Sequence, residues 1–344
     1  MAARSDPSAL RAARPRGRVV ALTGAAGFLG RNLVGVLEED PAVAAVIAID
    51  VTPPPTGGKK TRYYDVDLTA QSCEERIGEI LAAEHVDTVV HLAFVSAPTF
   101  ASAWAHELEA VGTMHLLNAA RQVGLRKLVL WSQTLLYGAL PSNPNFLTER
   151  HPLRADADEP FFADKMGAER LVASFGLKAR GSVVTVLRTA PILGPTVRNY
   201  LTHYLSQRAV LTLLGFDPLW QFVHEIDAIA AFKLAVDRDF PGAFNIVGDG
   251  VLPLSTVIRL AGRISVPVFH PLAKPLAGAM WAAQLGAVAP TAFLDYLRYL
   301  CVADGVKAAR VMGFRPAYTT REALVDFTSA QRLRDVRLLH ESQA

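Results

Sequence analysis

A glycine-spaced turn between an apolar run and a helix start is the feature that most constrains this chain. The turn reads Thr23-Gly24-Ala25-Ala26-Gly27-Phe28-Leu29-Gly30 and follows the run Val19-Val20-Ala21-Leu22. Gly24 permits the tight turn, Gly27 lets a phosphate approach the backbone, and Gly30 lets the helix pack closely on the strand. The free N–H groups at that helix start attract an anion. The pattern predicts a binding site for a dinucleotide pyrophosphate.

Asp50 supports this prediction and indicates which dinucleotide binds. It ends the apolar run Val46-Ile47-Ala48-Ile49, twenty residues after Gly30, where a carboxylate accepts hydrogen bonds from the adenosine ribose. A ribose 2′-phosphate would meet this negative charge at close range, so NAD is favoured over NADP. A basic segment follows with Lys59, Lys60 and Arg62. We interpret it as a solvated loop, and binding of a 2′-phosphate by these residues is the alternative.

Composition bounds the class of protein. The chain has 344 residues, 51% of them hydrophobic and 19% charged, which is enough to bury a large core. A net charge of +3 gives no basic face of the size that nucleic acid requires. Cys73 and Cys301 are far apart and have no metal-like spacing, so we expect no disulfide framework and no metal site. These features favour the reducing cytoplasm.

Apolar, β-branched runs alternate with helical patterns along the first half of the chain. Such alternation predicts an α/β fold, a Rossmann-type doubly wound parallel sheet covered by helices. The predicted strands are Val19 to Leu22, Val46 to Ile49, Val86 to Leu92, Lys127 to Trp131 and Val183 to Leu187. Glu107 to Val123 has the spacing of a single core-facing helix.

The pattern changes after Gly194-Pro195, where helical segments become shorter and strands become isolated, such as Gln221 to His224 and Phe244 to Val247. We predict a smaller C-terminal domain over the carboxyl ends of the sheet strands, where open α/β folds bind ligands. The expected divisions are a disordered basic arm (1–17), the dinucleotide-binding domain (18–195), the substrate-binding domain (196–330) and a polar tail that frays or forms an exposed helix (331–344). Segments after residue 195 that pack back into the dinucleotide-binding domain are compatible with this division.

The segment Pro275 to Leu294 contains no charged residue and is long enough to span a membrane. Pro275, Gly278, Pro290 and other polar or helix-breaking residues interrupt it, so we favour a buried helix or a lid over an apolar ligand. Membrane association through 275–294 is the minority interpretation.

With these motifs, the chain resembles the extended short-chain dehydrogenase/reductase family, in particular its NAD-dependent epimerase/dehydratase group, which includes UDP-glucose 4-epimerase-like proteins. The resemblance runs from about Arg18 to Phe327 and includes Asp67-Leu68, His91-Leu92-Ala93, and Phe222-Val223-His224 with Asp227. It also includes Arg188, Ile192, Gly194 and Pro195, and it implies a homodimer formed by helices around Ala103 to Val123 and Pro160 to Gly176. Lys165 and Glu169 keep the spacing of the helix that carries the family's catalytic lysine.

The resemblance implies roles for individual residues. Lys165 would hydrogen-bond the nicotinamide ribose, and Gln133 and Tyr137 would lie near the nicotinamide. Substrate contacts are expected from Gln133, Thr134, Trp220 and His224. The expected cofactor-binding residues are Gly24, Ala26, Gly27, Phe28, Leu29, Gly30, Asp50, Asp67, Leu68, Leu92, Ala93, Phe94, Lys165 and Pro191.

The chain departs from the family where proton transfer takes place. The family's general acid/base is a Tyr four residues before the lysine, and this position is Phe161. A phenyl ring neither donates nor accepts a proton, and such a step contributes about 10²–10⁴ in rate. Gln133 replaces a Ser or Thr, and Glu109 replaces an Asn. Trp220 replaces an Arg that reaches the diphosphate in nucleotide-sugar epimerases, which weakens the UDP-sugar interpretation.

Other side chains that can carry a proton are predicted near the cleft. We expect Tyr137 either to transfer a proton or to pack beneath the substrate loop, His91 to be a hydrogen-bonded core histidine, and Ser132 and Thr134 to satisfy backbone groups. Glu109 in a desolvated cleft has a raised pKa, but a surface salt bridge is the preferred explanation of it.

The matches to the family and the departures from it are compatible with three functions. The first is an enzyme that transfers hydride at a hydroxyl or carbonyl carbon with non-standard proton transfer. The second is a non-catalytic NAD(H)-sensing protein, and the third is a hydroxysteroid-dehydrogenase-like protein with an apolar substrate. All three expect a small molecule and no nucleic acid, and fold alone does not decide among them.

Overall fold

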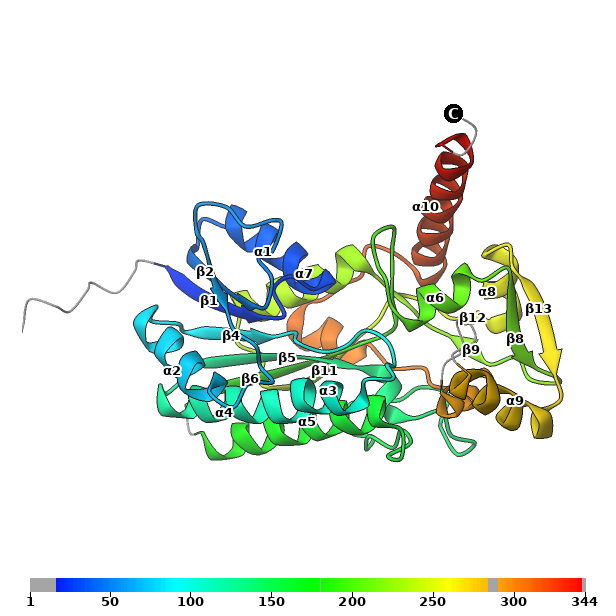
Figure 1. Cartoon of the computed structure of the whole chain (residues 1–344), viewed down its shortest axis with the longest axis horizontal. Coiled ribbons are helices and arrows are strands. Elements are labelled where there is room, and N and C mark those ends of the chain that lie inside the picture. Colours follow the sequence, from blue (N-terminus) through cyan, green and yellow to red (C-terminus); the bar gives the residue numbers. More distant parts are fainter. Residues whose placement is uncertain (1–16, 180, 284–289, 342–344) are drawn as a thin grey trace, which may run out of the picture.

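A seven-stranded parallel sheet forms the centre of the molecule (Figure 1). The computed structural model describes residues 17–179, 181–283 and 290–341, so the predicted basic arm lies outside the described residues except for Gly17. All neighbouring strands of this sheet run parallel. Their spatial order is β11 (Gly242–Ile246), β6 (Val183–Thr189), β5 (Lys127–Gln133), β4 (Thr88–His91), β1 (Arg18–Thr23), β2 (Val43–Asp50) and β3 (Thr61–Asp65).

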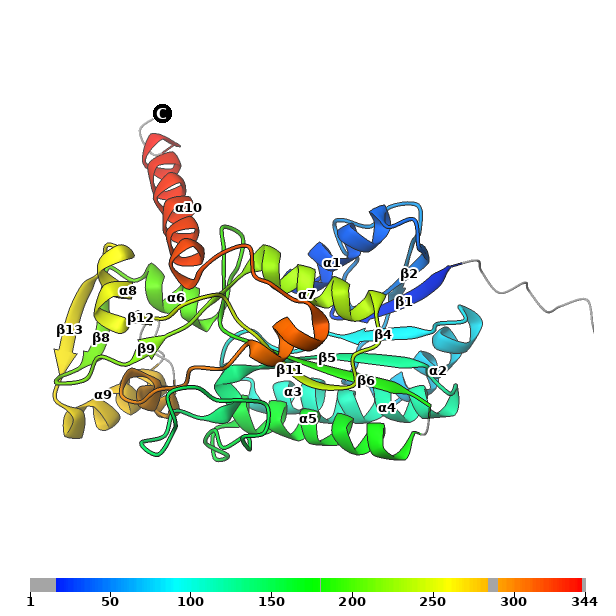
Figure 2. The same ribbon diagram turned by 180° about the vertical axis from the view of Figure 1, so that it is seen from behind.

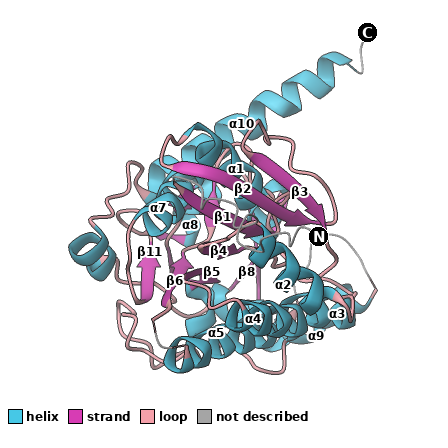
Figure 3. Cartoon of the chain, turned by 90° about the vertical axis from the view of Figure 1, so that its left-hand side faces the viewer, coloured by secondary structure: helices cyan, strands magenta, loops and turns pink. Residues whose placement is uncertain are grey.

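Helices cover both faces of the sheet, as Figures 1 and 3 show. One face packs against α1 (Phe28–Glu39) and α7 (Glu225–Asp237), and the other against α2 (Cys73–Ala83), α4 (Gly112–Gln122) and α5 (Pro160–Lys178). The central strands are buried on both sides, which explains why they read as continuous apolar runs. This arrangement confirms the predicted doubly wound α/β fold.

The strand order reverses between β1 and β4, because the chain first builds outward to β2 and β3 and then returns. In open α/β sheets, ligands bind at the carboxyl ends of the strands beside such a reversal. The glycine turn after β1 and the residues after β4 meet at this place. The topology therefore positions the candidate site where the sequence predicts it.

Smaller elements gather beyond the carboxyl ends of the sheet strands, as the view from behind in Figure 2 also shows. They form three two-stranded sheets: β10 (Val223–His224) with β7 (Ile192–Leu193), β12 (Leu252–Pro253) with β9 (Leu219–Trp220), and β13 (Ile264–Val268) with β8 (Ala209–Leu213). The remaining helices are α3 (Ser102–His106), α6 (Tyr200–Ser206), α8 (Leu254–Leu260), α9 (His270–Ala282) and α10 (Thr320–Glu341). The proposed division between residues 195 and 196 stays a prediction.

Two expectations about individual elements are wrong. The run Phe244 to Val247 is not an isolated strand, because Gly242–Ile246 forms β11 and pairs in parallel with β6 at the edge of the main sheet. Glu107 to Val123 is not one regular helix, because Glu107–Val111 forms a π-helical turn between α3 and α4. Such turns change which side chains face inward, and they are common at functional sites.

The uncharged segment Pro275 to Leu294 is divided in the structure. Its first part belongs to α9, which buries Ala273 and Ala277 and leaves Leu272 and Leu276 exposed. Residues 284–289 lie outside the described residues. Within the described ranges, no helix combines the length and the apolar character that crossing a bilayer requires.

Candidate active site

The glycine turn holds the start of α1 against the end of β4. Gly24 has φ +68°, and a Cβ on it would lie 2.8 Å from the Ala93 N atom. A Cβ on Gly30 would lie 2.1 Å from the Gly24 carbonyl oxygen, so helix and turn touch there. The structure gives α1 no side-chain cap, which leaves backbone N–H groups free for an anion. The turn thus has the space and the donors that a pyrophosphate requires.

Asp50 lies at the end of β2 and braces this turn. Its Oδ2 atom accepts a hydrogen bond from the Ala26 N–H at 2.9 Å, and its Oδ1 atom accepts one from the Val51 N–H at 2.8 Å. The basic residues that follow are directed elsewhere: Lys60 donates to the Asp40 carbonyl at 2.7 Å, and Arg62 pairs with Glu84. Lys60 and Arg62 therefore have partners other than a 2′-phosphate beside Asp50, in line with the preference for NAD.

A cleft of about 650 Å³ opens over the turn. Of the predicted cofactor residues, it is lined by Gly24, Gly27, Phe28, Leu29, Gly30, Leu92, Phe94 and Pro191, and Gln133 lines it too. The remaining predicted cofactor residues, Ala26, Asp50, Asp67, Leu68, Ala93 and Lys165, lie outside this lining. Asp67 accepts a hydrogen bond from the Thr69 N–H at 2.9 Å, and Leu68 is buried.

Sequence reasoning missed several residues of the cleft. Trp131 and Thr189 lie at the carboxyl ends of β5 and β6 and are joined by a 3.0 Å hydrogen bond from Trp131 Nε1; their place at the strand ends is a signal that could have identified them. The cations of the lining were also missed. Arg31 directly follows the glycine turn, whereas Arg198 and Arg334 come from distant parts of the chain. Three guanidinium groups favour a dianionic pyrophosphate.

Lys165 forms a buried ion pair instead of reaching into the cleft. Its Nζ atom donates to Glu109 Oε1 at 2.8 Å and to Oε2 at 3.0 Å, and the Val95 N–H donates to Oε1 at 2.6 Å. The side chains are 4% and 1% exposed. Burial raises the pKa of Glu109 and lowers the pKa of Lys165, and in each case the partner's charge opposes the shift. The expected surface salt bridge of Glu109 is wrong, because the π-helical turn directs the carboxylate inward.

Phe161 lies beside this pair in a cluster of aromatic rings. Lys165 Nζ is 3.7 Å from the centroid of the Phe161 ring. The Phe161 ring is 5.5 Å from Phe162, 5.7 Å from Phe293 and 6.1 Å from Tyr200, centroid to centroid. The place of the family's phenol is therefore occupied by hydrocarbon that packs against other rings.

Tyr137 is not in the cleft. Its hydroxyl donates to Asn245 Oδ1 at 2.8 Å and accepts from Arg188 Nη1 at 2.8 Å. Arg188 in turn pairs with Glu169, which also accepts from the Ser132 hydroxyl. This network is buried. Tyr137 thus packs in the interior, and proton transfer by its hydroxyl stays a prediction.

His91 and Thr134 are also placed away from a reactive position. His91 is fully buried between Thr23 Oγ1 at 2.6 Å and Thr113 Oγ1 at 2.8 Å, and burial lowers its pKa to about 3. It is the core histidine that the sequence predicts. Thr134 is buried and lines neither the cleft nor the apolar cavity described below, and its substrate contact stays a prediction.

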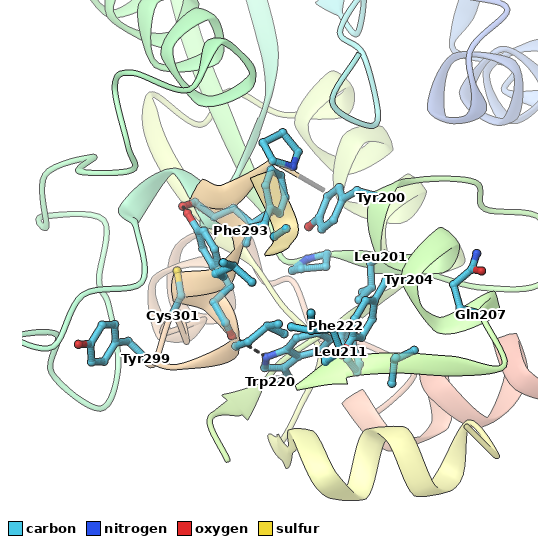
Figure 4. A pocket seen from close by; sticks show the side chains of 18 of the residues that line it. Tyr200, Leu201, Tyr204, Gln207, Leu211, Trp220, Phe222, Phe293, Tyr299 and Cys301 are labelled. Atoms are coloured by element: carbon cyan, nitrogen blue, oxygen red, sulfur yellow. Dashed lines mark hydrogen bonds between the residues drawn. The ribbon is translucent and has the colours of Figure 1, made fainter. Parts of the chain in front are cut away.

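A second cavity, of about 340 Å³, lies next to the cleft and is strongly apolar (Figure 4). Its walls come from α6, β8, β9, α9 and the segment after Pro290, and they include Tyr200, Leu211, Trp220, Phe222, Met280, Phe293 and Tyr296. None of the described residues that line it is a lysine, arginine, aspartate or glutamate. Tyr200 and Pro191 line both this cavity and the cleft.

The two predicted substrate residues on this side differ. Trp220 lines the apolar cavity, and its Nε1 donates to the Tyr296 carbonyl at 3.1 Å. His224 does not line it, because its ring is buried, stacks on Tyr318 at 3.8 Å and hydrogen-bonds Asp326 at 3.0 Å. His224 also accepts from the Ile226 N–H at the start of α7. His224 therefore lies outside the lining of this cavity, and its substrate contact stays a prediction.

A dinucleotide cleft at the reversal of a doubly wound sheet, with an adjoining ligand cavity, defines a protein of the extended dehydrogenase/reductase class. Residues 20–247 match the model of the NAD dependent epimerase/dehydratase family. The chain belongs to this family, in agreement with the resemblance and with the expected NAD cofactor.

Relatives extend the match along the chain. An uncharacterised protein of Mycobacterium tuberculosis is 34% identical over 313 residues, which cover 90% of this chain and 83% of that protein. A 3-diazoavenalumate denitrifying reductase of Streptomyces is 29% identical over 252 residues, covering 68% and 77%. The Thermus thermophilus UDP-glucose 4-epimerase in complex with NAD has a TM-score of 0.70 at 19% identity and covers 91% of this chain and 99% of its own. That last likeness shows the fold.

Proposed function

We propose that this protein binds NAD(H) in the cleft over the glycine turn and transfers hydride at a carbonyl or hydroxyl carbon of an apolar, ring-sized molecule held in the adjoining cavity. The observation that carries the proposal is the shared wall: Tyr200 and Pro191 line both spaces. A molecule in the apolar cavity would thus lie next to the part of the cleft above the ends of β5 and β6. When bound, NADH supplies the hydride.

The cleft fits the cofactor on grounds of its own. Its turn leaves no room for a Cβ at Gly24 or Gly30, its helix start is uncapped, and three arginines line it. Gln133 lines the same cleft at the end of β5 and has an amide that donates to a carbonyl oxygen. These groups bind and orient, while the apolar walls beside them exclude water.

The chemistry of the second cavity argues against a nucleotide sugar. A diphosphate there would lose hydration without a cationic partner among the described lining residues. Trp220 occupies the position at which nucleotide-sugar epimerases have an arginine, and it forms part of the cavity wall. The Streptomyces relative is named a 3-diazoavenalumate denitrifying reductase. Its name supports reduction of a small molecule that is not a nucleotide sugar.

A non-catalytic NAD(H)-sensing protein is the competing proposal. The specific observation in its favour is the pair of Glu109 with Lys165, which withdraws the lysine from the cleft, together with Phe161. This proposal expects cofactor binding but no hydride exchange with any ligand of the apolar cavity.

Calorimetry with NADH, followed by titration of 2-acetonaphthone or UDP-glucose into the complex, tests the proposal. We expect NADH and the naphthyl ketone to bind and UDP-glucose to give no heat. Leu211→Gln should weaken ketone binding because Leu211 lines the cavity, whereas Leu214→Gln should not, because Leu214 is 58% exposed and lies just beyond the same strand. No binding of NADH would contradict the proposal. Transfer of deuterium from [4-²H]NADH to the ketone would exclude the sensing alternative.

The expected homodimer is also a proposal. Helices α3, α4 and α5 expose Trp104 (50%), Met114 (42%) and Leu171 (38%), which is consistent with a self-association face there. Light scattering on the purified protein tests it, and a monomer at micromolar concentration would contradict it.

A further inference from the structure

The wall shared by the cleft and the apolar cavity contains a buried hydroxyl without a partner. Among the residues that the structure describes, none hydrogen-bonds Tyr200 Oη, although this atom is shielded from solvent. Burying a hydroxyl without a hydrogen bond costs about 1–3 kcal/mol. An unpaired group of this kind, at the junction of two ligand spaces, is suited to a partner that arrives with a ligand.

Tyr299 lines the cavity but not the cleft, and two further tyrosines of the cavity do not offer a free hydroxyl. Tyr204 Oη donates to the Leu211 carbonyl at 2.7 Å, and Tyr296 Oη donates to the Leu135 carbonyl at 2.7 Å. Neither of them lines the cofactor cleft. Tyr200 therefore combines two properties, a free donor and contact with both spaces, that Tyr204 and Tyr296 lack.

Tyr200 also lies next to the position from which the phenol is missing. Its ring centroid is 6.1 Å from that of Phe161, and the two rings meet edge to face at 71°. Figure 4 shows Tyr200 beside Phe293 in the wall of the cavity, and their ring centroids are 5.4 Å apart. The phenol of Tyr200 thus lies directly beside Phe161, the position at which the family has its catalytic tyrosine.

The backbone of Tyr200 is fixed by local structure. Asn199 caps α6, with Oδ1 accepting from the Leu201 N–H at 3.0 Å and the Thr202 N–H at 2.9 Å. The Tyr200 N–H donates to the Ser96 carbonyl at 3.3 Å in the loop after β4. The side chain therefore starts from a backbone position that is tied to the edge of the cofactor cleft.

From this geometry we propose that Tyr200 supplies the proton that Phe161 cannot, by donating its hydroxyl hydrogen to the carbonyl oxygen of a molecule in the apolar cavity. The inference rests on the proposed function. The carbonyl carbon accepts a hydride from bound NADH, which is oxidised to NAD⁺, and the carbonyl π bond breaks. The oxygen takes the Tyr200 proton, so the product is an alcohol, and the phenolate then recovers a proton from water.

The surroundings of Tyr200 keep its hydroxyl in the protonated form that carbonyl reduction requires. Burial raises the pKa of Tyr200 well above its ordinary value, so the hydroxyl stays protonated at neutral pH. The titratable groups near it are the Cys301 thiol, whose pKa burial raises to about 12, and the Tyr296 hydroxyl, whose pKa burial also raises. Both groups are therefore uncharged at neutral pH. Lys165 is directed at the face of Phe161 instead. A protonated donor assists carbonyl reduction, whereas the reverse reaction requires a base.

Isotope-edited infrared spectroscopy of [carbonyl-¹³C]2-acetonaphthone tests this inference in the NAD⁺ complex, where no turnover takes place. We expect the carbonyl stretch of the bound ketone to shift to lower frequency in the wild type and to lose that shift in Tyr200→Phe. The variant should bind the ketone about 3- to 10-fold more weakly, as loss of one hydrogen bond predicts, but bind 2-ethylnaphthalene equally well. Tyr64→Phe is the matched control and should retain the shift, because it removes a hydroxyl on β3 that pairs with Glu84 at the end of α2.

Turnover and stability supply two more readings. With NADH and the ketone, Tyr200→Phe should lower the rate of reduction by about 10²–10⁴, and the variant should unfold at a urea concentration no lower than the wild type because the hydroxyl is unpaired. An unchanged carbonyl shift in Tyr200→Phe, or clear destabilisation of that variant, would overturn the role of Tyr200. If neither naphthalene compound binds the wild-type NAD⁺ complex, the apolar substrate class itself is wrong.

Discussion

Both carboxylate oxygens of Glu109 lie within 3.0 Å of Lys165 Nζ, inside the protein. Removing two charges from water costs several kcal/mol per ion, and their attraction offsets this only when the remaining hydrogen bonds are satisfied. The Val95 N–H satisfies one carboxylate oxygen further. The pair therefore fixes the packing of the π-helical turn against α5, next to the cofactor cleft.

Truncation of one partner of this pair should destabilise the protein strongly. Glu109→Ala leaves a buried ammonium without a counter-charge, which typically costs about 3–5 kcal/mol. The double variant Glu109→Ala with Lys165→Met removes both charges and should recover a large part of this loss. Urea unfolding of the wild type, both single variants and the double variant measures the coupling.

Additive effects of the two substitutions would contradict a strong pair. The expected coupling is negative, because the second substitution removes the charge that the first one leaves unpaired. Gly35→Ala in α1, where an added Cβ would meet only the Thr56 side chain, provides a baseline for unrelated changes.

The glycine turn gives a second prediction. A Cβ on Gly30 would meet the Gly24 carbonyl oxygen at 2.1 Å and the Ala25 Cα atom at 2.7 Å, both of them backbone. Gly30→Ala should therefore displace the turn and weaken NADH binding by about tenfold or more, since about 1.4 kcal/mol corresponds to tenfold. Fluorescence titration with NADH measures the change.

Gly35 lies in the same helix and makes this experiment specific. Its Cβ would approach the Thr56 Cβ atom at 3.7 Å, which is an ordinary contact. Gly35→Ala should leave NADH affinity unchanged and stabilise the helix by about 0.5–1 kcal/mol. Equal affinity for NADH in the two variants would show that the cofactor does not contact this turn.

Tyr137 provides a third prediction, which separates a structural hydroxyl from a catalytic one. Tyr137→Phe removes the donor to Asn245 Oδ1 and the acceptor for Arg188 Nη1. A buried bond to a charged group is worth about 1.5–3 kcal/mol, so the melting temperature should fall. The dissociation constant of NADH should stay the same. A weakened cofactor affinity with unchanged stability would place the hydroxyl back in the cleft.

The sequence predicted those parts of the fold that depend on local pattern. The central strands are apolar throughout because they are buried on both faces, and the glycine spacing follows from close backbone contacts. β3 was missed because Thr61–Asp65 is an edge strand with largely exposed side chains and no apolar run. β11 was predicted as an isolated strand, because its pairing with β6 joins residues far apart in the chain.

The site was predictable only in its cofactor half. The turn and the strand ends carry a spacing that reflects direct contact with a dinucleotide, whereas the burial of Glu109 depends on an irregular π-helical turn that periodicity treats as ordinary helix. Tyr200 has no neighbouring residue that distinguishes it in the sequence. Its unpaired hydroxyl arises from the meeting of α6, the loop after β4 and the segment near Phe293, which is a property of the tertiary structure.

His91 gives a prediction about pH. Burial lowers its pKa from 6.5 to about 3, so between these values the unfolded chain binds a proton that the folded chain does not. The stability that His91 contributes is therefore complete above about pH 6.5 and decreases as the pH falls, by about 1.4 kcal/mol per unit within the window. Urea unfolding at pH 7.5, 5.5 and 4.5 should show this decrease.

Substitution of His91 measures how much of the decrease in unfolding free energy at low pH this residue causes. His91→Gln keeps an amide near Thr23 and Thr113, the two hydrogen-bond partners of the ring, but it does not titrate. Its stability should depend less on pH between 6.5 and 4.5 than that of the wild type, even if it is lower at pH 7.5. His203→Gln, at an exposed position of α6, should keep the wild-type dependence. If the slopes of wild type and His91→Gln coincide, the histidine is protonated in the folded protein, and its burial between the two threonines does not exclude charge.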